Sequence, residues 1–182
     1  MATGGLGGVH RDAAVSFDES ADLTALSRTP VLVVASGVKS ILDIAATLER
    51  LDSLGVAVVG YRTTEFPGFY LRSSGLALDW SVSTPAEAAA AFRAHGELSA
   101  AGMLLANPVT LEGQLDPDEH ERALRGAFQA VRERNVTGKA VTPMLLAEFA
   151  RLTGGASVAV NRDLVVANAR LAGEVAAGLA AS

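Results

Sequence analysis

The feature that most constrains the fold is a pair of short apolar runs separated by one amphipathic segment. Residues 30–35 read PVLVVA and residues 56–61 read VAVVGY, and both runs are rich in β-branched residues. Runs of this length and composition are typical of buried strands. Between them, residues 40–55 carry apolar side chains at steps of three and four and end at Gly55, as an amphipathic helix does. Strand, helix and strand in this order predict parallel strands joined by a crossover helix.

The rest of the chain continues the alternation of strands and helices. Residues 102–108, GMLLANP, form a third apolar run, and the stretch LDWSVS indicates a further short strand. The stretch STPAEAAAAFRAHGEL has a capping hydroxyl, an early proline and an acid, which are helix start signals. Three more helices are expected over residues 116–135, 142–155 and 157–180. We therefore predict one α/β domain over residues 1–182, a three-layer α/β/α sandwich with a largely parallel sheet.

Composition and charge narrow the possible partners and the location. The net charge of -5 offers no basic surface for a phosphate backbone, so we expect no nucleic-acid partner. The absence of cysteine excludes disulfides and fits a reducing cytoplasm. No apolar run approaches the roughly 18 residues that span a bilayer, and the first residues lack the pattern of a signal peptide. We expect a soluble cytoplasmic protein without a membrane partner.

Lys39 stands directly after the first apolar run and before the amphipathic segment. One interpretation is a surface lysine in the first helical turn. Another is a ligand site, because ligands bind at the carboxyl ends of parallel strands, where the next helix points its positive N-terminus. The helix dipole and partial burial would then favour the neutral amine, which attacks a sugar carbonyl to form a Schiff base. The stretch SGVKS lacks the first glycine and the adjacent Gly-Lys pair of GxxxxGK[ST], which excludes a phosphate-binding loop of that kind.

A second polar cluster lies in the stretch FDESADL, where Asp18 and Asp22 flank Ser20. These side chains could cap a short helix. Asp18 and Asp22 could instead give oxygen ligands to Mg²⁺ or Mn²⁺, which prefer such ligands. His10 could join as a metal ligand or act as a hydrogen-bonding group, and Arg11 follows a glycine-rich turn where it could contact an anion.

Several motifs together resemble the pseudouridine-5'-phosphate glycosidase family. They are GGLGGVHR, FDESADL, VVASGVKSILD, VAVVGY, YRTTEFPGFYLRSSG, LLANP, GKAVTPMLLAEFARLTGG and SVAVNRDLVVANARLAGEVA, in the order of the family and over essentially all 182 residues. The resemblance implies that this sequence corresponds to the C-terminal two-thirds of the family's domain. The family's N-terminal third includes a glutamate proposed as proton donor and a lysine that contacts the sugar phosphate, and nothing here corresponds to them.

The resemblance implies reversible cleavage of the carbon–carbon bond between uracil and ribose 5-phosphate. Lys39 falls on the family's Schiff-base lysine, which attacks C1′ of the ring-opened sugar, and Asp18 falls on a manganese ligand. An imine suits this bond, because it gives the carbon an electron sink that acid hydrolysis lacks. The family further implies a homotrimer. The residues expected to contact substrate are Ser20, Ala21, Asp22 and Asn161.

Two expectations remain open beside this one. The alternative function is an inactive fragment that at most binds ribose phosphate or serves as an oligomerisation module, with exposed sheet edges that favour assembly or poor solubility. The choice of Mn²⁺ over Mg²⁺ rests on the resemblance alone. The sequence also departs from the family in one place, because SGVKS replaces the pattern AGAKS and puts Val38 before the lysine, where it could tighten the pocket.

Overall fold

Within the described residues, four strands form one parallel sheet. A computed structural model describes residues 1–180, apart from the side chain of Lys139. The strands are β1 (Leu32–Ala35), β2 (Ala57–Tyr61), β3 (Ser81–Val82) and β4 (Met103–Ala106). Their order is β1-β4-β2-β3, and every neighbouring pair is parallel. The predicted strands are confirmed, and β4 lies between β1 and β2, with Leu105 in register with both Val34 and Val59.

The helices also follow the predicted order along the chain. Thr84 caps α4 as its sequence signals indicate, since its side chain accepts a hydrogen bond from the Glu87 amide at 3.1 Å. Within residues 1–180, no helix is both long and apolar enough to cross a membrane. The helices are α1 (Ala13–Ser16), α2 (Ala21–Leu26), α3 (Ile44–Ser53), α4 (Pro85–Leu98), α5 (Pro117–Glu133), α6 (Val141–Leu152) and α7 (Ala156–Ala180), with a 3₁₀ turn at Gly138–Ala140.

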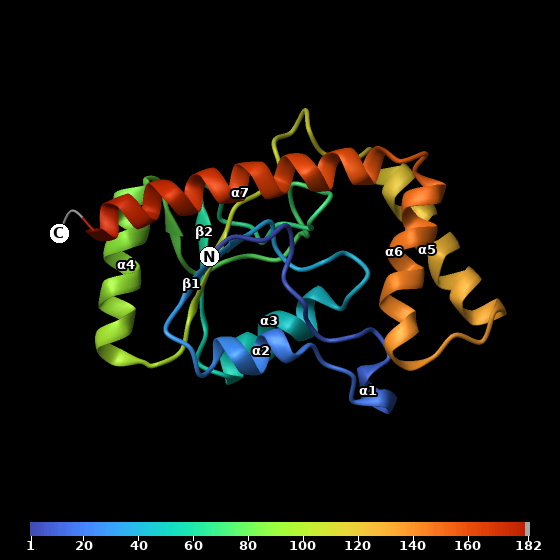
Figure 1. Ribbon diagram of the computed structural model, residues 1–182, viewed down its shortest axis with the longest axis horizontal. Helices are drawn as coiled ribbons and strands as arrows, with labels where there is room; N and C mark the ends of the chain where they lie inside the picture. Colours follow the sequence, from blue (N-terminus) through green and yellow to red (C-terminus); the bar gives the residue numbers. More distant parts are fainter. Residues whose placement is uncertain (181–182) are drawn as a thin grey trace.

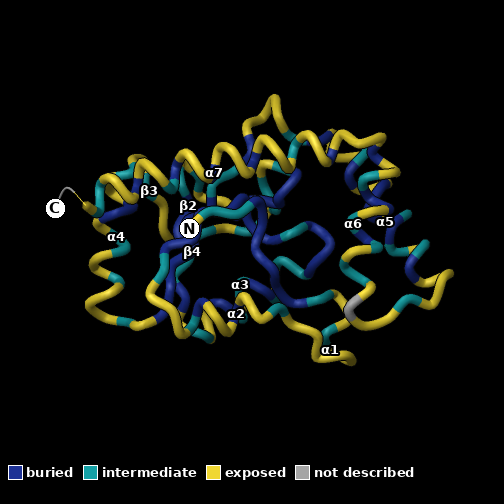
Figure 2. Tube along the Cα trace, viewed as in Figure 1, coloured by how far each residue is buried: buried dark blue, intermediate teal, exposed yellow. Residues whose placement is uncertain are grey.

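Helices cover both faces of the sheet (Figure 1). On one face, Val34 and Leu105 pack with Leu171 of α7 and with residues of α4. On the other face, Val33 and Leu104 belong to a core that includes residues of α2, α3, α5 and α6. Side chains alternate between these two cores because successive residues of a strand point to opposite faces. Figure 2 shows the buried strands between helices whose outer sides are exposed, which confirms the three-layer sandwich.

The first crossover helix begins later than its sequence predicts. The apolar pattern predicts a helix from residue 40, whereas α3 begins at Ile44, with the Asp43 side chain accepting a hydrogen bond from the Ala46 amide at 2.9 Å. The preceding residues are held by long-range pairing instead, since the Lys39 amide donates to the Leu6 carbonyl at 3.2 Å. Lys39 therefore lies outside the helix, and the interpretation that places it in the first helical turn is wrong.

The N-terminal residues run along the free edge of β1. They form no regular strand in the described chain, as the glycine content predicts, but Ala2 and Val34 form an isolated parallel bridge, and so do Leu6 and Val38. The Ser36 amide donates to the Gly4 carbonyl at 2.8 Å. The glycine-rich segment, residues 3–8, is thereby fixed beside the carboxyl end of β1.

Candidate active site

Lys39 lines a cavity of about 320 Å³ beyond the carboxyl end of β1. This volume is at the lower end of the range found for small-molecule pockets. The cavity walls come from five parts of the chain, namely the glycine-rich segment, the turn after β1, the loop after β2, α6 and α7. Its lining residues are Thr3, Gly4, Gly5, Lys39, Phe69, Tyr70, Leu146, Ala150, Ser157, Val158, Asn161 and Val165.

Glycine is required where the N-terminal segment forms the cavity wall. A Cβ atom on Gly4 would lie 2.6 Å from Oδ1 of Asn161. A Cβ atom on Gly5 would lie 2.6 Å from two ring carbons of Phe69 and 3.4 Å from Cγ of Lys39. The backbone can approach these side chains closely only because both positions lack a side chain.

The loop after β2 is held against the turn that carries Lys39. Gly37 has a φ of 86°, and a Cβ atom there would lie 2.1 Å from the Pro67 carbonyl oxygen. Phe69 has a φ of 66°, in the left-handed region that costs a non-glycine residue about 1–3 kcal/mol. Its amide donates to the Ser36 carbonyl at 3.1 Å. This contact places the ring of Phe69 in the cavity wall next to Gly5.

Tyr70 supplies a buried phenol to the same wall. Its ring stacks on Phe149 with centroids 5.0 Å apart, and the Phe69 ring lies 4.4 Å away. Burial raises the pKa of Tyr70 to about 12, and a hydrogen bond with Ser157 opposes this effect. The hydroxyl therefore stays protonated at neutral pH and can both donate and accept a hydrogen bond. Sequence reasoning missed both aromatic residues, although their position in FPGFY, directly after a Pro-Gly pair in the loop after a strand, was a usable signal.

The predicted substrate residues of α2 lie at the other end of the glycine-rich segment. Ser20 is the N-cap of α2 and accepts a hydrogen bond from the Asp22 amide at 3.2 Å, which confirms the capping interpretation for this serine. Oδ2 of Asp22 accepts from the Gly7 amide at 2.9 Å. Ala21 begins the helix and is exposed. None of these three residues is among those lining the Lys39 cavity.

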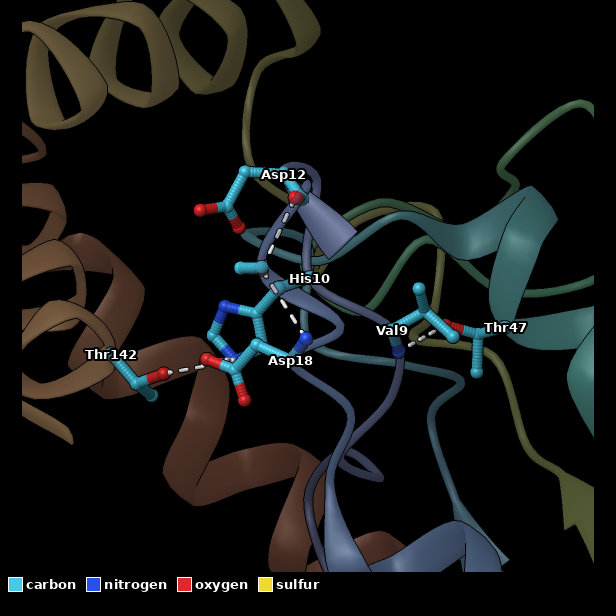
Figure 3. A network of polar contacts seen from close by, with 7 residues as sticks. Val9, His10, Asp12, Asp18, Thr47 and Thr142 are labelled. Atoms are coloured by element: carbon cyan, nitrogen blue, oxygen red, sulfur yellow. Dashed lines mark hydrogen bonds and ion pairs between the residues drawn. The ribbon is translucent and has the colours of Figure 1, made fainter. Parts of the chain in front are cut away.

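Asp18 lies beside His10 on a surface turn (Figure 3). Oδ2 of Asp18 is 3.8 Å from Nε2 of His10, which is also 3.5 Å from the Thr142 hydroxyl. Among the described residues, no group of three or more histidine or acidic side chains is arranged to hold a metal. Hard divalent cations commonly keep several waters and bind through one or two carboxylates. Asp18, whose side chain is 47% exposed, fits as a single ligand of such a hydrated ion.

Arg11 and Val38, which adjoin His10 and Lys39 in the sequence, have structural roles. One guanidinium nitrogen of Arg11 donates to the Ser40 carbonyl at 3.0 Å, and the group lies 5.2 Å from the centre of the Phe128 ring. Arg11 therefore ties the turn after Lys39 to α5. Val38 is fully buried in the core and is not among the residues that line the cavity, so it does not tighten the pocket.

Of the predicted residues, the structure brings Lys39 and Asn161 to one cavity. The other predicted residues, Asp18, Ser20, Ala21 and Asp22, do not line it. Asn161 comes from α7, far along the chain from Lys39, and is exposed at the cavity. Ser20 and Asp22 contact Gly7, and Asp18 pairs with His10. Each of these groups contacts the N-terminal residues: Gly4 lies against Asn161, Gly7 against Ser20 and Asp22, and His10 beside Asp18.

These features define a three-layer α/β protein with a lysine-lined cavity at the end of a parallel strand. The model of the indigoidine synthase A-like protein family matches residues 1–178, and the chain belongs to this family. The chain is 58% identical over 184 residues to a pseudouridine-5'-phosphate glycosidase of Salinispora tropica, covering 100% of this chain and 56% of the relative. It is 52% identical over 182 residues to a protein of the same name from Streptomyces griseus, again covering 56% of the relative. The resemblance seen in the motifs is confirmed.

Two solved structures share the fold. The prealnumycin C-glycosynthase AlnA, in complex with ribulose 5-phosphate, superposes with a TM-score of 0.92 at 35% identity, covering 99% of this chain and 60% of AlnA. An indigoidine synthase A-like protein from Thermotoga maritima gives a TM-score of 0.85 at 38% identity, covering 96% of this chain and 57% of that protein. The chain thus spans little more than half the length of these relatives.

Proposed function

We propose that this chain carries the lysine chemistry of a pseudouridine-5'-phosphate glycosidase, the reversible splitting of the bond between uracil and ribose 5-phosphate. The observation that carries the proposal is the convergence of Lys39 and Asn161 on one cavity, in a chain at least half identical to two proteins of that name. A sugar phosphate as the substrate class is supported by the related AlnA, whose structure contains ribulose 5-phosphate.

In this proposal Lys39 is the nucleophile. Its neutral amine adds to the C1′ aldehyde of open-chain ribose 5-phosphate, and loss of water leaves an imine. The imine carbon then accepts an electron pair from uracil C5, which forms the carbon–carbon bond, and the C5 proton leaves. The sugar O4′ hydroxyl then replaces the Lys39 amine at C1′, which closes the ring and frees the lysine. Cleavage is the reverse: the Lys39 amine replaces O4′ at C1′, which opens the sugar ring, and C5 regains the proton. The carbon–carbon bond then breaks with its electron pair passing to the uracil ring while the nitrogen lone pair forms the imine, and water releases the sugar from Lys39.

The remaining residues would position the substrate. Asn161 offers both a donor and an acceptor at the cavity that holds Lys39, as recognition of a uracil edge requires. Ser20, Ala21 and Asp22 would contact substrate from the far end of the glycine-rich segment. The aromatic ring of Phe69 lies against Gly5 in the cavity wall, where it would limit the access of water.

The same proposal extends to a metal and to assembly. Asp18 would hold a hydrated Mn²⁺, which when bound supplies positive charge next to the anionic oxygens of the substrate. A homotrimer and a cytoplasmic location are proposed with the function, the first from the family resemblance and the second from the cysteine-free sequence.

The decisive experiment is borohydride trapping of the chain with ribose 5-phosphate and Mn²⁺, read by intact mass and peptide mapping. The chain contains only two lysines, Lys39 and Lys139, so the adduct can be assigned sharply. Lys139→Ala leaves Lys39 as the sole lysine and should give the wild-type yield of adduct. Lys39→Ala leaves Lys139 as the sole lysine and should give none.

A folded chain that yields no adduct on Lys39 would overturn the catalytic proposal. Calorimetry with ribose 5-phosphate would then separate the two alternatives. Binding without an adduct would favour a ribose-phosphate-binding module, and the absence of both would favour an oligomerisation module. A trapped adduct on Lys39 whose yield falls when uracil is present before borohydride is added would show that the imine reacts with uracil, which is the synthetic direction of the chemistry.

A further inference from the structure

We propose that Asn168 of α7 is a positioning residue that sets the shape of the Lys39 cavity by holding the glycine-rich segment against the ends of β1 and β4. The inference rests on the proposed function for its consequence in catalysis, but its structural basis is independent. Asn168 is fully buried, and it does not line the cavity itself.

The side-chain amide of Asn168 joins three separate parts of the chain. Its Nδ2 donates to the Thr3 carbonyl at 2.8 Å and to the Ser36 hydroxyl at 3.0 Å, with the Gly4 carbonyl 3.4 Å away. Its Oδ1 accepts from Nδ2 of Asn107, which directly follows β4, at 2.8 Å. One buried amide therefore ties α7 to the N-terminal segment and to the ends of two neighbouring strands.

The position requires a side chain that both donates and accepts. An asparagine amide carries two N–H donors and a carbonyl acceptor, and the contacts use both ends. Aspartate would keep an acceptor for Asn107 but would place a carboxylate against the Thr3 and Gly4 carbonyls. Leucine would leave these polar groups without their partner in a buried site, which is unfavourable.

The same contacts reach the reactive lysine through the N-terminal segment. Thr3 and Gly4 line the cavity, and the Gly4 backbone approaches Asn161 so closely that no Cβ atom would fit. Two residues further on, the Leu6 carbonyl accepts the backbone amide of Lys39. A shift of this segment would change both the width of the cavity and the position from which the Lys39 side chain extends.

The test compares Asn168→Asp with the wild type by two readouts. The first is hydrogen exchange at the Leu6 and Lys39 amides, which requires no activity, and we expect faster exchange in the variant. The second is the rate of borohydride-trapped adduct formation as a function of ribose 5-phosphate concentration. We expect the maximal rate to fall on the order of 10-fold to 100-fold, since small displacements of reacting groups have effects of this size. The half-saturating concentration should change less, because Ser20 and Asp22 lie at the far end of the segment.

Leu171→Ala is the matched control. Leu171 lies one turn further along α7, is buried and packs in the apolar core on the sheet, so this variant loosens α7 without touching the N-terminal segment. It should lower thermal stability while leaving the maximal trapping rate and the exchange of the Leu6 amide near wild type. Asn168→Ser, whose shorter hydroxyl cannot span the same contacts, serves if the aspartate variant does not fold, and should show both effects in milder form.

The outcomes separate this inference from the proposed function. Wild-type exchange rates together with a wild-type trapping rate in both Asn168 variants would overturn the positioning role. An equal loss of trapping rate in Leu171→Ala would also overturn it, because the effect would then follow stability alone. A wild-type chain that forms no adduct would refute the proposed function. Faster hydrogen exchange in Asn168→Asp would still support the inference that Asn168 fixes the position of the N-terminal segment.

Discussion

Individual glycines decide how closely the backbone segments around Lys39 can approach one another. Gly37 is the most demanding of them, because it combines a positive φ with a carbonyl oxygen in the place where a side chain would stand. Its neighbour Val38 points into the core, and Lys39 reaches the cavity. The short stretch SGVKS thus turns the chain at the end of β1 and presents the lysine.

We predict that Gly37→Ala destabilises the protein by roughly 3 kcal/mol, because the new methyl group would overlap the Pro67 carbonyl and force the loop away from β1. The measurement is urea unfolding followed by circular dichroism. Gly75→Ala is the control, since Gly75 also has a positive φ of 79° but no atom stands within 4 Å of its missing side chain. This control should be destabilised only by the cost of a positive φ for a non-glycine residue, about 1–2 kcal/mol. Equal losses in the two variants would contradict the steric explanation.

At the scale of elements, the sequence predicts the strands and helices that depend on interactions between residues close together in the chain. The three strands and the helices after them could be predicted, because consecutive residues show both the apolar runs of buried strands and the periodicity of amphipathic helices. The late start of α3 was not, because residues before Ile44 pair with Leu6 and Val9, far away in the sequence. The position of β4 between β1 and β2 likewise depends on pairing between distant segments.

In the candidate site, too, local sequence patterns predict some residues, whereas contacts between distant segments could not be predicted. Lys39 could be recognised from its place after a strand, whereas its meeting with Asn161 depends on the path of α7 across the sheet. Asn168 left a signal that was not used. It stands in the buried stripe of α7 with Leu164, Leu171 and Val175, and a polar residue in an apolar stripe indicates a buried hydrogen-bonding role.

His120 makes the packing of α5 on α6 sensitive to acid. Its ring is buried and meets Phe149 of α6 edge to face at 5.4 Å, and within the described chain its Nε2 has no hydrogen-bond partner. Burial lowers the pKa of His120 below its ordinary value of 6.5; the charge of Arg11 also lowers it, and that of Glu121 opposes the shift.

We predict that the wild type loses stability as the pH falls below about 6.5, because the unfolded chain takes up a proton at this ring that the folded protein resists. His120→Leu should remove this part of the pH dependence. The check is urea unfolding of both proteins at pH 8 and at pH 5. The stability difference between variant and wild type should shift in favour of the variant at pH 5, and a constant difference would contradict the prediction.

For the molecule as a whole, one face of α7 leaves apolar side chains in solvent. Val158 is 60% exposed, Val165 41% and Val166 64%, and the first two also line the Lys39 cavity. Exposed apolar groups on one helix face favour association. The sequence-based expectation of assembly remains a prediction, and this face is where it can be tested.

We predict that the chain self-associates at micromolar concentrations and that Val166→Glu shifts it toward the monomer. Val166 is the suitable site because it does not line the cavity. Light scattering coupled to size exclusion gives the mass of each species. Ala176→Glu, at an exposed position further along α7, adds the same single negative charge and is the control. A monodisperse wild-type monomer would count against the prediction.

The strand order also governs when the protein can take shape during synthesis. The ribosome makes β1 and β2 before β4, and β1 and β2 are not paired with each other. Until β4 is made, β2 can pair only with the two residues of β3, and β1 has no regular strand beside it. The cavity needs still more of the chain, because its walls extend from Thr3 to Val165 of α7. Pairings of such long range are slow to form. A nascent chain therefore carries Lys39 without a pocket around it until α7 has been made and lies over the sheet.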